Sequence, residues 1–315
     1  MRLLTRSDND GLMCAVLLKE LNMYDEIKFV HPKDIQDNLI EVTDQDILVN
    51  IPYVKGCGLW FDHHTSEQER GSADGIEFKG SVWSAQSCAR VIYDYYGGEE
   101  KLGKFKEMLD AVDKADAAHF TRDEILNPER WVLLSFIMDP RTGLGRYRDY
   151  RISNYQLMMM LIDELRHKSV DEILAMDDVQ ERVRRYEEHK PHFLQMMFEY
   201  STAEGEVIVT DLRDVPETYV GNRHVIYALY PYQNISIRII DGKDKEFCVF
   251  SVGYSILNRT STVDVGSLML KYGGGGHKAV GTCQVPYSEA ERILDEMLHF
   301  INVEHKSVLK SASPE

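Results

Sequence analysis

The chain has 315 residues, 43% of them apolar, and its 36 basic and 52 acidic side chains give a formal net charge of −16. This length and composition predict a globular protein of two domains. The acidic balance disfavours long duplex DNA as a partner, because affinity for DNA comes from many basic phosphate contacts. No segment approaches the roughly 18 consecutive apolar residues of a membrane-spanning helix, so we expect no membrane association. Scattered cysteines without a C-x-x-C pair, and no signal-like N-terminus, predict a cytoplasmic protein.

The N-terminal part alternates short β-prone runs with helical patterns. Strands that alternate with helices along the sequence usually form a parallel sheet, so we expect an α/β domain over residues 1–155. The β-prone runs are rich in Ile, Val, Leu and aromatic residues and lie at 1–5, 27–30, 46–51 and 58–61. Helical patterns follow at 12–21, 84–96, 102–116 and 131–138.

After residue 155 the sequence pattern changes twice, first to charged helical segments and then to alternating β-type runs. Residues 156–204 are mostly helical and strongly charged, and we expect them to connect the two domains. A smaller α+β domain is predicted for residues 205–304, followed by a frayed polar tail at 305–315. Its β-type runs lie at 206–210, 224–229, 235–240 and 247–252, and its closing helix lies at 288–301.

Two carboxylates directly follow the first predicted strand, in the motif Asp8-Asn9-Asp10-Gly11. Side chains two apart in extended backbone point the same way, and Gly11 permits a tight turn into a helix whose positive end faces the site. The plainer interpretation is a helix N-cap with a spare acid. Taken alone, this motif is a weak signal.

A second polar motif, Asp62-His63-His64, follows the strand at 58–61. In an open parallel sheet, ligands gather beyond the carboxyl ends of the strands, so this triplet is expected to meet Asp8 and Asp10. Carboxylates with imidazoles and no cysteine suit Mn²⁺ or a similar divalent ion. The coincidence of both motifs with this topology disfavours a chance arrangement in a surface loop.

The third motif is a run of four glycines, Gly273 to Gly276, ahead of His277. Consecutive glycines are costly in chain entropy, so close backbone approach is the expected benefit, and amides in such a loop bind anions. The adjacent imidazole is placed to donate to a phosphate oxygen. A simple turn ahead of a strand is the alternative.

With these three motifs in this order, the sequence resembles the DHH phosphoesterase superfamily with its C-terminal DHH-associated domain, the group of RecJ-like nucleases, nanoRNase–pAp phosphatases and exopolyphosphatases. The resemblance spans residues 1 to about 301. It implies a two-metal site, usually with Mn²⁺ and alternatively Mg²⁺ or Co²⁺, in which Asp62, His63 and His64 are catalytic. The implied metal ligands are Asp8, Asp10, Asp62, His63 and Asp116, with Asp113 as the competitor of Asp116.

Several positions depart from the family pattern. Arg6 stands where relatives often carry His or Asp, and Asn50 stands where an aspartate usually bridges two ions. Tyr254 replaces an expected arginine, so Asn258 or Arg259 would have to bind phosphate in its place. The expected substrate-binding residues are therefore Arg6, Asn50, Asn258, Arg259, Gly274, Gly275, Gly276 and His277.

The function expected from this resemblance is hydrolysis of phosphate esters in short oligonucleotides or nucleotides by a metal-activated water. Candidate substrates include pAp, dinucleotides, products of cyclic dinucleotides, and polyphosphate. Exopolyphosphatase activity is one alternative, and a nucleotide-binding regulatory protein with weakened turnover is the other. Homodimer formation stays open. Close in sequence to the domain boundary, Arg146, Arg148 and Arg151 either line the cleft or belong to a solvated loop.

Overall fold

The computed structural model describes residues 1–64 and 77–305, which form two compact units. Unit 1 comprises Met1–Phe120 and Asn127–Tyr186, and unit 2 comprises Thr121–Leu126 and the chain from Glu187 onward. The units divide within helix α11 (Asp177–Glu199), so the helices expected to connect two domains belong largely to unit 1. Of the tail expected at 305–315, residues 306–315 lie outside the described residues. Along the described chain, no helix combines the length and apolar character needed to cross a bilayer.

Unit 1 is built on a five-stranded sheet in the order β2-β1-β3-β4-β5, with every neighbouring pair parallel. The predicted α/β fold class is therefore confirmed. Thr5 pairs with Val49 and Val49 with Phe61, so β1, β3 and β4 end together at one edge of the sheet. The strands are β1 (Arg2–Thr5), β2 (Glu26–Phe29), β3 (Asp46–Val49), β4 (Leu59–Asp62) and β5 (Gly80–Val82).

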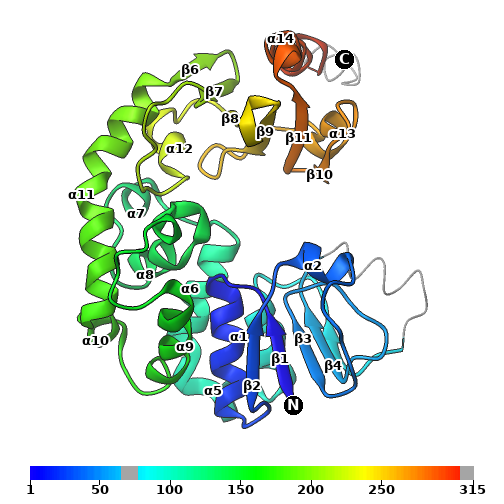
Figure 1. The fold of residues 1–315 in the computed structure, drawn as a ribbon, viewed down its shortest axis with the longest axis vertical. Coiled ribbons are helices and arrows are strands. Elements are labelled where there is room, and N and C mark those ends of the chain that lie inside the picture. Colours follow the sequence, from blue (N-terminus) through cyan, green and yellow to red (C-terminus); the bar gives the residue numbers. More distant parts are fainter. Residues whose placement is uncertain (65–76, 306–315) are drawn as a thin grey trace, which may run out of the picture. The chain divides into compact units, whose positions relative to one another are not determined.

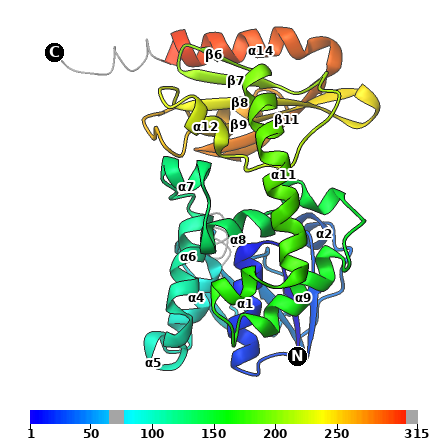
Figure 2. The ribbon, with the colours of Figure 1, turned by 90° about the vertical axis from the view of Figure 1, so that its left-hand side faces the viewer.

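Helix α1 (Asn9–Glu20) packs against α4, α6 and α9 on one side of the sheet (Figures 1 and 2). Its residues Leu12 to Leu18 are all buried, as expected for a helix enclosed by a sheet and other helices. On the other side, Leu4, Leu48 and Trp60 pack with Ile35 of α2. The remaining helices of unit 1 are α2 (Pro32–Gln36), α4 (Cys88–Tyr95), α5 (Gly98–Leu102), α6 (Lys106–Asp116), α8 (Arg130–Met138), α9 (Asn154–Glu164) and α10 (Val170–Leu174).

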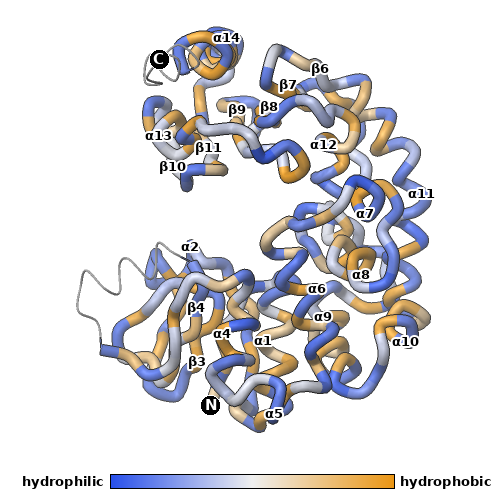
Figure 3. Tube along the Cα trace, turned by 180° about the vertical axis from the view of Figure 1, so that it is seen from behind, coloured by the Kyte–Doolittle hydropathy of each residue, from blue (hydrophilic) through white to orange (hydrophobic). Residues whose placement is uncertain are grey.

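Unit 2 is built on a six-stranded mixed sheet in the order β10-β11-β9-β8-β7-β6. Alternate residues of the central strands are buried against α13 and α14, whereas Ser236, Arg238 and Ser251 lie on the opposite face. Polar and apolar residues alternate along α11, as in a helix with one buried side (Figure 3). The elements are α7 (Arg122–Leu126), β6 (Ser201–Glu204), β7 (Val207–Asp211), α12 (Val225–Leu229), β8 (Ile235–Asp241), β9 (Phe247–Tyr254), α13 (Val265–Leu270), β10 (Gly275–His277), β11 (Val280–Pro286) and α14 (Ala290–His299).

The prediction of a β-type run at 224–229 is wrong, because this segment forms helix α12. Residues Val225 to Ala228 are buried without interruption, so the run lacks the alternation that marks a half-buried strand. A short continuous apolar run does not distinguish a buried strand from a buried helix.

Part of the expected glycine loop is the edge strand β10, which pairs antiparallel with β11. A Cβ at Gly274 would lie 2.1 Å from the carbonyl oxygen of Thr282, and one at Gly276 would lie 2.3 Å from that of Val280. These two glycines allow close approach of the neighbouring strand. A Cβ at Gly275, by contrast, would meet nothing within 4 Å.

These positions give a matched pair of variants. Gly276→Ala should lower the free energy of unfolding of unit 2 by about 1–3 kcal/mol, because its methyl group would overlap β11. Gly275→Ala adds the same methyl group to open space and should change stability far less. Thermal and urea unfolding measure both; equal destabilisation by the two variants would contradict this packing.

Candidate metal centre

The turn from β1 into α1 positions the first carboxylates. Asp8 caps α1, and its Oδ1 accepts a hydrogen bond of 2.9 Å from the amide of Gly11. A Cβ at Gly11 would lie 2.1 Å from the carbonyl oxygen of Arg6, so only glycine fits here without a backbone shift. The N-cap interpretation of this motif therefore holds for Asp8.

Asp10 lies in the first turn of α1 and is only 2% exposed. Its carboxylate accepts hydrogen bonds of 2.9 Å from the backbone amides of Cys88 and Ala89, at the start of α4. Burial raises the pKa of Asp10 well above its usual value, and the nearby carboxylates of Asp116 and Asp8 raise it further. A cation bound here would relieve this repulsion.

The triplet that follows β4 is held together by one carboxylate oxygen. Oδ1 of Asp62 accepts from the amides of His63 (2.6 Å) and His64 (3.0 Å), and it lies 2.6 Å from Nδ1 of His64. The hydrogen bond that His64 donates to Asp62 raises the pKa of His64. Asp62 is 1% exposed, so this arrangement is anchored within the protein.

His63 faces the other carboxylates. Its Nδ1 lies 3.3 Å from the carbonyl oxygen of Ala85, to which it donates, and this leaves Nε2 without a proton in the neutral ring. Nε2 is 3.7 Å from Oδ2 of Asp10 and 3.4 Å from Oδ2 of Asp116. Three acceptors that face one another require a proton or a metal ion between them. Asp10, His63 and Asp116 therefore fit a divalent cation, and Asp62, His63 and His64 form a second group of ligand atoms.

The structure separates the two aspartates of α6. Asp113 accepts from the hydroxyl of Ser87 at 2.6 Å and from Nε of Arg90 at 2.8 Å, and it is 3% exposed. It joins α6 to α4. Asp116 is the one that lies beside His63.

Arg6 and Asn50, both expected to contact substrate, lie against Asp8. Nε of Arg6 is 3.0 Å from Oδ2 of Asp8, and Nδ2 of Asn50 is 3.5 Å from its Oδ1. Asp8 is thus held by two side chains of this chain and belongs to neither group of ligand atoms found among the described residues.

Sequence reasoning missed Arg141, in the turn after α8. Nε of Arg141 donates to Asp139 at 2.8 Å. Although burial lowers the pKa of Arg141, the carboxylates of Asp139, Asp8 and Asp116 raise it above its ordinary value. No motif marked this position, because its proximity to Asp8 and Asp116 arises only from the folding of distant segments. Arg146, Arg148 and Arg151 were expected either to line the cleft or to lie in a solvated loop. Arg151 forms an ion pair with Asp178.

The residues expected to bind phosphate in unit 2 have local partners. Asn258 donates to the carbonyl oxygen of Tyr232 at 2.8 Å, and Nε of Arg259 donates to that of Ile256 at 3.0 Å. His277 is exposed at the end of β10.

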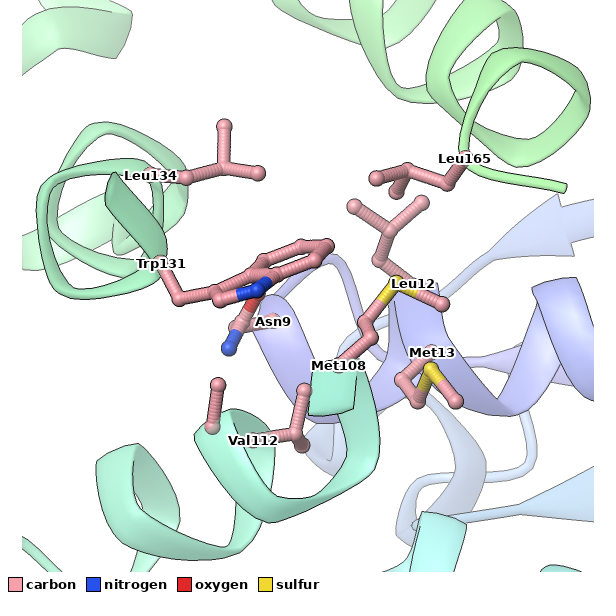
Figure 4. A pocket seen from close by; sticks show the side chains of 9 residues that line it. Asn9, Leu12, Met13, Met108, Val112, Trp131, Leu134 and Leu165 are labelled. Carbon is pink, nitrogen blue, oxygen red and sulfur yellow. The ribbon is translucent and has the colours of Figure 1, made fainter. Parts of the chain in front are cut away.

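A small apolar hollow lies behind the turn that carries the carboxylates (Figure 4). Its volume of about 10 Å³ has room for about one water molecule, so it excludes a nucleotide base. Asn9, which stands between Asp8 and Asp10 in the sequence, contributes its side chain to the wall of the hollow. The hollow has nine lining residues. It is lined by Asn9, Leu12, Met13, Met108, Ala111, Val112, Trp131, Leu134 and Leu165.

Among solved structures, the chain is similar to the pGpG-specific phosphodiesterase PggH from Vibrio cholerae. The two are 46% identical over 96% of this chain and 98% of PggH, with a TM-score of 0.84. A crystal structure of the exonuclease RecJ bound to manganese is 12% identical, over 95% of this chain and 89% of that one, with a TM-score of 0.50, and it supports the fold alone. No protein-family model and no curated protein matches the chain.

Metal binding should depend on Asp116 and not on the acidity of α6 in general. Asp116→Asn removes a charge 3.4 Å from His63 and should weaken Mn²⁺ binding at least about tenfold, or ~1.4 kcal/mol. Asp110→Asn removes a charge from the exposed part of the same helix and should leave the affinity unchanged. Isothermal calorimetry measures both; equal affinities would place the ion elsewhere.

Proposed function

Because this chain belongs to the DHH superfamily of phosphoesterases, we propose that it hydrolyses the phosphodiester bond of short linear dinucleotides of the pGpG type, with Mn²⁺ as its cofactor. The single observation that carries the proposal is the convergence of Asp10, His63 and Asp116 at the edge where β1 and β4 end. The similarity to PggH along almost the whole of both chains supports the choice of substrate.

The proposed ion is held by Asp10, His63 and Asp116, with Asp62 and His64 beside them. Carboxylate and imidazole ligands without cysteine favour Mn²⁺ and also accept Mg²⁺ or Co²⁺. When bound, such an ion lowers the pKa of a coordinated water and neutralises charge on a phosphate oxygen. The carbonyl of Ala85 fixes the ring of His63, and the amides at the start of α4 fix Asp10, so both side chains would hold the ion without rearrangement.

Unit 2 is proposed to bind the phosphate of a nucleotide through β10. Gly275 leaves open space above β10, and His277 at the end of that strand is exposed and able to donate to a phosphate oxygen. Asn258 and Arg259 would complete this contact. A short substrate fits an acidic protein better than a long polyanion does, because the negative surface repels charge that extends beyond the site.

The catalytic role of the triplet is tested with purified protein, pGpG and Mn²⁺. Wild type should release mononucleotide, a chelator should abolish the activity, and added Mn²⁺ should restore it. His63→Ala should lower kcat at least about 100-fold, or ~2.7 kcal/mol of transition-state stabilisation, because His63 faces both carboxylates. His167→Ala, an exposed histidine of unit 1, serves as the control and should retain activity.

The alternatives give different outcomes in the same assay. Release of phosphate from polyphosphate without cleavage of any dinucleotide would identify an exopolyphosphatase. Nucleotide binding without turnover under any of the three ions would identify a regulatory protein. Either result would contradict the proposed function.

The role of His277 predicts a separate kinetic signature. A contact that is equally strong in the ground state and the transition state affects KM, so His277→Ala should raise KM at least as much as it lowers kcat. His299→Ala, exposed on α14, is the matched control for unit 2. If His277→Ala binds pGpG with unchanged affinity, the proposed phosphate contact at β10 is refuted.

A further inference from the structure

Asp8 stands in a position where a metal ligand was expected, yet both its carboxylate oxygens are engaged by the protein. Oδ1 accepts from the amide of Gly11 at 2.9 Å and lies 3.5 Å from Nδ2 of Asn50. Oδ2 lies 3.0 Å from Nε of Arg6. The negative charge of Asp8 is therefore balanced by a fixed guanidinium.

Asn50 explains why this pairing is favoured. It follows β3 at the same edge of the sheet, is 2% exposed, and has a φ of 57°, a conformation that Asn and Asp both tolerate. Its amide group donates toward Asp8, whereas an aspartate here would place two carboxylates in contact and require a cation between them. The amide oxygen Oδ1 is buried and has no hydrogen-bond partner among the described residues. An unpartnered buried acceptor points to a ligand that donates a hydrogen bond or coordinates it.

We infer that the site holds one divalent ion per chain, at Asp10, His63 and Asp116, and that the guanidinium of Arg6 takes the place of a second cation and binds the substrate phosphate. This inference rests on the proposed function. Nε is the Arg6 atom nearest Asp8, at 3.0 Å from Oδ2, and among the described residues the two Nη groups pair with no carboxylate other than Asp8. The side chain is 36% exposed, so these groups can reach a ligand.

A guanidinium suits this role for physical reasons. Its charge is permanent, and its planar fork donates two parallel hydrogen bonds to the oxygens of a phosphodiester. Asp8 orients the guanidinium, and the exposed part of the Arg6 side chain is left for the substrate. The unpartnered Oδ1 of Asn50 is a buried neutral acceptor, and the expected donor to it is a water molecule. Asp8 and Asn50 are then positioning residues, and Arg6 is the residue that contacts the substrate.

The number of ions is measured on the protein without substrate, by calorimetric titration and electron paramagnetic resonance with Mn²⁺. Wild type should bind one ion per chain and give the spectrum of isolated Mn²⁺ at saturation. The double variant Asn50→Asp, Arg6→His restores a bridging carboxylate and removes the guanidinium, and it should bind two ions with exchange-coupled spectra. Arg184→Ala, which removes an exposed arginine of unit 1, should behave as wild type.

Two coupled ions in wild type would overturn the inference, and so would a folded double variant that still binds one. Should the double variant fail to fold, Arg6→Ala provides the test. It should raise the KM for pGpG at least about tenfold, or ~1.4 kcal/mol, while still binding one Mn²⁺ per chain. An unchanged KM would overturn the role of Arg6. The absence of any dinucleotide hydrolysis by wild type would instead refute the proposed function. The number of bound ions is measured without substrate, so the two failures can be told apart.

Discussion

The buried carboxylate of Asp10 holds the first turns of two helices together. It lies at the start of α1 and accepts hydrogen bonds from two of the free amides at the start of α4, so the positive ends of both helices face one point. Loss of these hydrogen bonds would leave two buried amide donors without partners and a site without its central ligand. The position of α4 relative to the sheet depends on this contact.

The rest of the site is arranged around this carboxylate. The parallel sheet brings the end of β4 beside the turn after β1, which places His63 within 3.7 Å of Asp10. Helix α6 adds Asp116, and the bond from Arg90 to Asp113 keeps α6 against α4. The result is a concentration of negative charge that the helix ends offset only in part, since the pKa of Asp10 is still raised by burial and by its neighbours. That imbalance is the physical reason for a cation at this edge.

Much of this arrangement could be predicted from the sequence, because it depends on local pattern and on one topological rule. Alternating strands and helices predicted the parallel sheet, and the rule that strand ends converge predicted that Asp10 and His63 would meet. The choice between Asp113 and Asp116 stayed open because residues three apart lie on the same side of a helix. They are separated by tertiary contacts: Asp113 binds Ser87 and Arg90, and Asp116 lies beside His63.

Other features depend on contacts that no local pattern carries. The pairing of Arg6 with Asp8 results from the conformation of one turn, and the proximity of Arg141 to the carboxylates results from the path of the chain after α8. Helix α12 was mistaken for a strand because a continuous apolar run fits either structure. The glycines before His277 have two roles, since Gly274 and Gly276 allow β11 to approach while Gly275 faces open space.

We expect a single ion between Asp10, His63 and Asp116. Anomalous diffraction at the manganese absorption edge, from crystals grown with Mn²⁺, locates a bound ion without reference to activity. It should show one peak per chain, close to Nε2 of His63 and to the Oδ2 atoms of both aspartates. A peak held by Asp8 and Asn50, or no peak at this edge of the sheet, would contradict this expectation.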